Sequence, residues 1–126
     1  LPAVEDLMER ALALDEGYDQ GALHEFFVSY DPTRPEPKGG NQKAKEHLDR
    51  AVQLDGGRRL GVQVAYAEGV LVARQERALF TKMLQDVLAV DILRDEPAWR
   101  AERLPNVVAQ QRARWLLAKI DDLFAN

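Results

Sequence analysis

The sequence predicts an all-α fold of about six helices, stacked as helical hairpins in a single domain over residues 1–126. Three observations predict it. One short segment recurs three times along the chain, and each copy has the periodicity of an amphipathic helix. Apolar residues in 3–14 follow the i, i+3, i+4, i+7 spacing of one helix face. Proline and glycine gather between the helical stretches, where they favour turns.

The repeated segment covers residues 8–15, 48–55 and 84–91, at intervals of 40 and 36 residues. Each copy reads as a helix that ends in an aliphatic residue followed by aspartate. Gly17 and Gly57 follow the first two copies and suit left-handed helix stops. Gly21 and Gly61 come early in the next helix, where a small residue allows close helix packing. This order is typical of the junction between tetratricopeptide (TPR) units, which are ~34 residues long, so we expect a TPR-like solenoid.

The expected elements follow in chain order, with boundaries taken from the apolar pattern and from turn residues. Asn41 and Asn106 are placed to act as N-caps. The segment 31–40 holds Pro32, Pro35 and Pro37 and predicts a loop, and 91–105 holds Pro97 and Pro105 and predicts a linker. The predicted helices are 3–14, 19–30, 42–54, 60–74, 76–90 and 107–124.

The first predicted helix has the pattern of the second helix of a TPR pair, so its own partner would precede Leu1. A solenoid seldom begins on half a repeat, because the half repeat leaves an apolar face uncovered. We therefore interpret the chain as the C-terminal part of a longer protein. Val4, Leu7, Met8 and Leu12 are then expected to be partly uncovered here.

Composition excludes several classes of function. The formal net charge is −4, which argues against nucleic-acid binding. The absence of cysteine excludes thiolate catalysis and cysteine-based metal sites. His24 and His47, the two histidines, are a weak metal signal without a carboxylate cluster, and Ser29 lies in no nucleophile motif. We expect a protein that is not an enzyme and needs neither cofactor nor metal.

The helix 60–74 is apolar nearly all round. One stripe runs through Val62, Tyr66 and Val70, and a second through Leu60, Val64, Ala67 and Leu71. Such a helix is either buried between neighbours or lines an apolar cavity. Glu68 lies within this run and would either face solvent or hold a polar group at a pocket mouth.

Two aromatic features leave similar alternatives open. Leu23, Phe26, Phe27 and Tyr30 form a stripe that is either core or one wall of a groove. Trp115 lies off the main apolar stripe of the last helix, and it either covers the end of the stack or anchors an interface. The candidate ligand-binding residues are Phe27, Tyr30, Val64, Tyr66, Glu68 and Leu71.

An ordered set of segments resembles the T component of TRAP-type transporters over nearly the whole chain. The set includes Gly56-Gly57-Arg58 with Leu60-Gly61, then Val64–Glu68, then Arg77–Phe80 with Val87–Asp91, and finally Asn106–Phe124. The resemblance implies a periplasmic, lipid-anchored helical protein that forms oligomers, with a trimer expected. It also implies association with a TRAP-class periplasmic solute-binding protein and an apolar tunnel suited to a hydrophobic small molecule.

The function expected from these observations is that of an accessory subunit of a TRAP-type uptake system. It would bind a solute-binding protein and an apolar ligand. The alternative is a generic TPR scaffold that grips a peptide in its concave groove. Peptide-carboxylate clamps need cationic and amide side chains, whereas the helices 19–30 and 60–74 offer mainly apolar ones.

Overall fold

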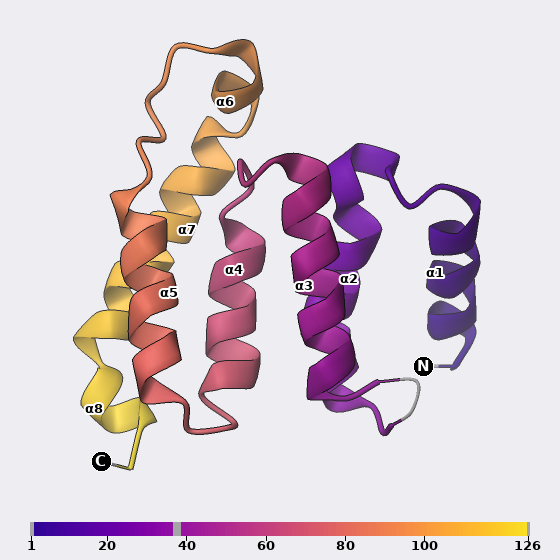
Figure 1. The fold of residues 1–126 in the computed structure, drawn as a ribbon, viewed down its shortest axis with the longest axis horizontal. Helices are drawn as coiled ribbons and strands as arrows, with labels where there is room; N and C mark the ends of the chain where they lie inside the picture. Colours follow the sequence, from indigo (N-terminus) through magenta and orange to yellow (C-terminus); the bar gives the residue numbers. More distant parts are fainter. Residues whose placement is uncertain (1, 37–38, 126) are drawn as a thin grey trace. The chain divides into compact units, whose positions relative to one another are not determined.

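A computed structural model describes residues 2–36 and 39–125, and it confirms the all-α prediction: these residues form helices and turns without a strand (Figure 1). The chain divides into two compact units, Leu1–Gly56 and Gly57–Asn126. The solenoid arrangement stays a prediction. In chain order the first unit holds α1 (Pro2–Leu14), η1 (Tyr18–Gly21), α2 (Ala22–Tyr30), η2 (Asp31–Thr33) and α3 (Asn41–Asp55). The second holds α4 (Gly61–Tyr66), η3 (Ala67–Leu71), α5 (Arg77–Ala89), α6 (Pro97–Ala101), α7 (Arg103–Ala118) and α8 (Ile120–Leu123).

In the first unit, α2 packs against α3 (Figure 1). The buried apolar residues of α3 are Ala44, Leu48 and Ala51, which share one face at helical spacing. Gly21 has a φ of 92°, and a Cβ at that position would lie 3.2 Å from Leu54. Only glycine fits both constraints without strain, so the predicted close approach at Gly21 is present.

The apolar face of α1 is largely uncovered within the described residues, as the sequence predicts. Val4 and Leu7 are 40% and 67% exposed, and Leu14 is 87% exposed. Met8 and Leu12 are half-buried. Burying such side chains is worth roughly 1.5–3 kcal/mol each, so this helix gains less from packing than its apolar content allows.

In the second unit, α4 and its continuation η3 pack with α5 and α7. The core contains fully buried Leu71, Phe80, Leu84, Val87 and Leu116. η3 is a π-helical turn: the Val72 and Glu76 amides donate to the carbonyls of Ala67 and Leu71, five residues earlier. The predicted helix 60–74 therefore ends in a widened turn, and Gln75 then adopts a left-handed φ of 55°.

The structure corrects several local predictions. The expected linker 91–105 contains α6 and the first turn of α7, because Pro105 lies where a helix leaves its N–H groups unbonded and costs little. Neither Asn41 nor Asn106 is an N-cap, since both lie inside helices. Gly17 has a φ of −81° and is not a left-handed stop, whereas Gly56 and Gly57 are left-handed. Gly61 has open space around it and makes no close approach. Pro37 lies outside the described residues.

Candidate functional site

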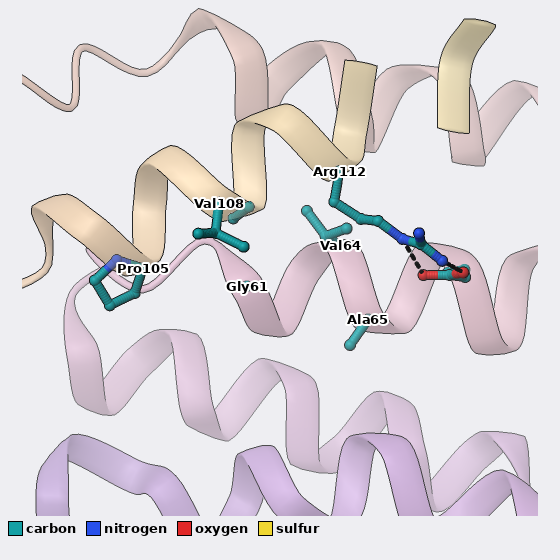
Figure 2. A pocket seen from close by; sticks show the side chains of 8 residues that line it. Gly61, Val64, Ala65, Pro105, Val108 and Arg112 are labelled. Atoms are coloured by element: carbon teal, nitrogen blue, oxygen red, sulfur yellow. Dashed lines mark hydrogen bonds and ion pairs between the residues drawn. The ribbon is translucent and has the colours of Figure 1, made fainter. Parts of the chain in front are cut away.

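An apolar groove runs between α4 and α7 within the second unit. Gly61, Val64 and Ala65 contribute one side and Pro105, Val108 and Ala109 the other, and the groove has a volume of about 240 Å³. Figure 2 shows Pro105 and Val108 on α7 and Gly61 at the start of α4, on the two sides of the groove. The groove is apolar because small and branched side chains line it, so it suits an apolar group more than water.

An ion pair between Glu68 and Arg112 borders the groove. Arg112 of α7 reaches across to Glu68, with Nε 3.1 Å from Oε1 and an Nη2–Oε2 contact beside it (Figure 2). The pair is therefore bidentate, the geometry that suits guanidinium and carboxylate best. Both side chains remain partly exposed. Since the guanidinium carries five N–H donors and Glu68 takes two, Arg112 keeps donors for a polar group placed at this end.

The predicted ligand-binding residues separate into three settings. Val64 and Glu68 line the groove. Tyr66 and Leu71 are buried in the second unit, at 6% and 2% exposure, and do not line it. Phe27 and Tyr30 belong to the first unit. A ligand-binding role for the last four residues stays a prediction.

The sequence does not predict the other wall of the groove. Pro105 falls in the expected linker 91–105, and no local pattern sets Val108 and Arg112 opposite Val64 and Glu68. Their i, i+3/i+4 spacing along one helix face was the available signal. It was not decisive, because nothing in the spacing says which helix this face approaches.

The aromatic stripe of α2 packs into a polar cluster of the first unit. Phe27 stacks on His47 with ring centroids 4.9 Å apart, and the Arg34 guanidinium lies over Phe27. The Tyr30 hydroxyl donates to Glu5 at 2.6 Å, and this hydrogen bond raises the pKa of Tyr30. In these contacts the stripe serves the packing of its own unit.

The two histidines face each other, a contact that the sequence did not predict. His24 Nδ1 and His47 Nδ1 are 2.7 Å apart, and His24 Nε2 is 2.8 Å from Glu16. Arg50 also donates to Glu16, and the hydrogen bonds from Arg50 and His24 lower the pKa of Glu16 to about 2. Burial, followed by the charges of His24 and Arg34, lowers the pKa of His47 to about 4.

These contacts place one hydrogen of the pair and share a second. Glu16 is ionised and only accepts, so His24 Nε2 carries a hydrogen, and one further hydrogen lies between the two Nδ1 atoms. His47 Nε2 is 3.4 Å from Asp31 Oδ2. Burial raises the pKa of Asp31, whose Oδ1 accepts from Arg34. Within the described residues, no three acidic or histidine side chains are arranged to hold a metal ion.

A second hollow lies in the first unit. Ala11, Leu14, Asp15, Tyr18 and Leu23 line it, and its volume is about 300 Å³. Leu14 and Tyr18 are 87% and 62% exposed, so it is part of the uncovered face beside α1. None of the predicted ligand-binding residues lies in it.

The described residues thus form an all-α protein with an apolar groove between α4 and α7, bordered by the Glu68–Arg112 ion pair. None of the helices in the described residues has the length and continuous apolar character needed to cross a bilayer. The family model for the TRAP transporter T-component matches residues 1–124. The chain therefore belongs to the TRAP transporter T-component family, whose members are accessory components of transporters and not known enzymes.

The chain is also similar to a protein of Treponema pallidum (strain Nichols) that is described only as uncharacterized. The two are 29% identical over 122 residues, which cover 94% of this chain and 36% of the relative. The chain thus spans about a third of the length of that relative.

Proposed function

We propose that the chain is the part of a TRAP transporter accessory subunit that binds a periplasmic solute-binding protein and holds an apolar ligand in the α4–α7 groove. The observation that carries the ligand proposal is the groove itself: an apolar lining bordered by the Glu68–Arg112 ion pair. An apolar tail would displace poorly bonded water from the lining. A carboxylate or hydroxyl at its end would meet the spare N–H donors of Arg112.

Family membership supports the transporter role over a generic peptide-binding scaffold, and the groove chemistry agrees with it. A peptide-carboxylate clamp needs several cationic or amide groups that converge on one point, whereas Arg112 is the groove's one cation and is paired with Glu68. The same proposal places the full-length protein in the periplasm, attached to the membrane by a lipid anchor and assembled as an oligomer, a trimer by family resemblance. These points rest on the family.

The groove is tested by filling it. Gly61 lies at the start of α4, and a Cβ there meets nothing within 4 Å, so Gly61→Leu should fold normally while its side chain occupies the groove. We expect this variant to bind a dansyl-labelled fatty acid at least tenfold more weakly than the unmodified protein. Fluorescence titration gives the affinities, and a thermal melt establishes that the variant is folded.

Gly69→Leu is the matched control. Gly69, within the turn η3, also has open space at its Cβ and a φ outside the left-handed region, but it does not line the groove. Its affinity for the same probe should be unchanged. Equal binding by both variants would contradict the groove as the ligand site. Association with the solute-binding protein is measured separately, by sedimentation of the two purified proteins together.

A further inference from the structure

The outward face of α7 carries an apolar seam that no described residue covers. Leu104, Val108 and Trp115 are 74%, 57% and 48% exposed. Together with exposed Gln111 and Ala118 they follow a 4-3-4-3 spacing along the helix. The opposite face of α7 is buried through Asn106, Ala109, Gln110, Ala113 and Leu116. Packing within the second unit therefore uses one face of α7 and leaves this seam open.

The spacing of the seam is that of the a and d positions in a helix that pairs with another helix. In this register Val108 and Trp115 are a positions, and Leu104, Gln111 and Ala118 are d positions. The seam spans 14 residue steps, or about 21 Å of helix at 1.5 Å per residue. It is long enough for a single partner helix of three to four turns to lie along it.

Cations occupy the flanking positions. Arg112 is an e position and Arg114 is a g position in the same register, and Lys119 is the C-cap residue that directly follows the seam. Arg114 is exposed and makes no ion pair with any described residue, while Arg112 is partly neutralised by Glu68. The helix α7 contains three arginines and no acidic residue, although the whole chain has a net charge of −4. In paired helices these flanking charges set the choice of partner.

Two cations lie against the ring of Trp115 and restrain its side chain. The Arg112 guanidinium lies 4.3 Å and the Lys119 ammonium 4.0 Å from its ring centroid, which restrains a side chain that is still half exposed. A large, pre-oriented aromatic residue between cations is a common anchor in protein interfaces. The structure thus favours the interface alternative for Trp115 over the end-capping one.

We propose that the α7 seam, defined as Leu104, Val108, Gln111, Trp115 and Ala118, docks an acidic amphipathic helix of a partner protein. The partner would place apolar residues on the seam and Glu or Asp opposite Arg112, Arg114 and Lys119. This inference rests on the proposed accessory function, because it assigns a surface to the association with the solute-binding protein. A docked helix would also border the groove, since Val108 belongs to both.

The test uses two synthetic peptides of 21 residues with Leu at every a and d position. One carries Glu at all e and g positions and the other carries Lys, so neither pairs well with itself. Binding to the intact chain is measured by fluorescence anisotropy of a label on each peptide. We expect the Glu peptide to bind at least tenfold more tightly, with an affinity that falls as salt is added. Because the chain is acidic overall, unspecific attraction would favour the Lys peptide.

Two variants locate the binding on the seam. Arg114→Glu/Lys119→Glu should reverse the preference between the peptides, and Trp115→Ala should weaken the binding of both. The matched control is Lys43→Glu/Lys45→Glu, which makes the same charge change at two exposed lysines of α3. It should leave the preference unchanged. Equal affinity for the two peptides, or a reversal by the control variant, would overturn the inference.

Binding measurements with the solute-binding protein distinguish a failure of this inference from a failure of the proposed function. If the Glu peptide is preferred and the solute-binding protein does not bind, the surface assignment stands and the proposed function is wrong. If the solute-binding protein binds the Arg114→Glu/Lys119→Glu variant as well as it binds the unmodified chain, the function stands and the seam is not its docking surface. Self-association that Trp115→Ala abolishes would identify the seam as a contact between copies and overturn the partner assignment.

Discussion

At the scale of single residues, two buried amides of α7 tie the second unit together. The Asn106 side chain accepts a hydrogen bond from the Leu60 amide at 3.0 Å and donates to the Arg58 carbonyl at 2.7 Å. The Gln110 amide donates to the carbonyls of Val87 and Val90 at the end of α5. Each side chain therefore bonds backbone groups that helix ends leave unpaired, and Asn106 fixes the start of the helix that forms one wall of the groove.

We expect Asn106→Ala to lower the free energy of unfolding by about 2–4 kcal/mol. The substitution leaves the Leu60 amide and the Arg58 carbonyl without their partner in a buried place, and each unpaired group costs roughly 1–3 kcal/mol. Urea denaturation followed by circular dichroism measures the change. Gln111→Ala, an exposed amide on the same helix, is the control and should stay within about 0.5 kcal/mol. Equal effects of the two substitutions would show that the Asn106 hydrogen bonds contribute nothing.

At the scale of elements, the entry into α2 is set by backbone conformation. Asp19, Gln20 and Gly21 have φ values of 45°, 57° and 92°. This left-handed run ends at Gly21, where an added Cβ would lie 3.2 Å from Leu54 of α3. The strain that the two non-glycine residues accept therefore leads directly into a tightly packed point between the turn and α3. The repeat pattern placed a small residue at this point, but it does not encode the left-handed turn before it.

Gly21→Ala should destabilise the first unit by more than about 1 kcal/mol. The new Cβ would be forced into a left-handed conformation and would lie 3.2 Å from Leu54. Gly17→Ala provides the comparison, because Gly17 has a φ of −81° and its nearest new contact would be an ordinary 3.6 Å. That variant should be neutral or slightly stabilising. Thermal melts of both variants decide the point, and a Gly21→Ala protein as stable as the Gly17→Ala protein would contradict it.

At the scale of the whole molecule, the sequence predicts helices well and their neighbours poorly. The periodicities of 3–14, 42–54 and 76–90 recover α1, α3 and α5 within about two residues, because local spacing alone determines which face is apolar. Proline misled the prediction at 91–105, since Pro105 is harmless in a first turn. The sequence singles out Val64 and Glu68 because they lie in an unusually apolar helix, and both line the groove, while their role in ligand binding stays a prediction. The sequence does not predict that Pro105, Val108 and Arg112 line the groove. Only the tertiary packing of α7 beside α4 brings them there, and local spacing does not encode that packing.

The His24–His47 pair is a further case of tertiary contact, and it links α2, α3 and the turns that hold Glu16 and Asp31. The pair holds one proton between its two Nδ1 atoms, so a second proton there would break the hydrogen bond and place a charge in a buried site. Acid should therefore act on the stability of the folded chain through this pair. The structure gives the sign of the effect.

Lowering the pH from 6.5 to 4 should destabilise the chain through His47. In the unfolded chain its pKa is near 6.5, whereas burial lowers the pKa of His47 in the folded chain to about 4. The unfolded state thus binds more protons in this window, so the contribution of His47 to stability is complete above pH 6.5 and is lost as the pH falls. The loss is about 3 kcal/mol at 1.36 kcal/mol per pKa unit.

Asp31, whose pKa burial raises, acts in the opposite direction. His47→Gln keeps Asp31, so urea denaturation at both pH values should show a smaller acid loss in this variant than in the unmodified chain. An identical loss in both would mean that the pair does not control the acid response.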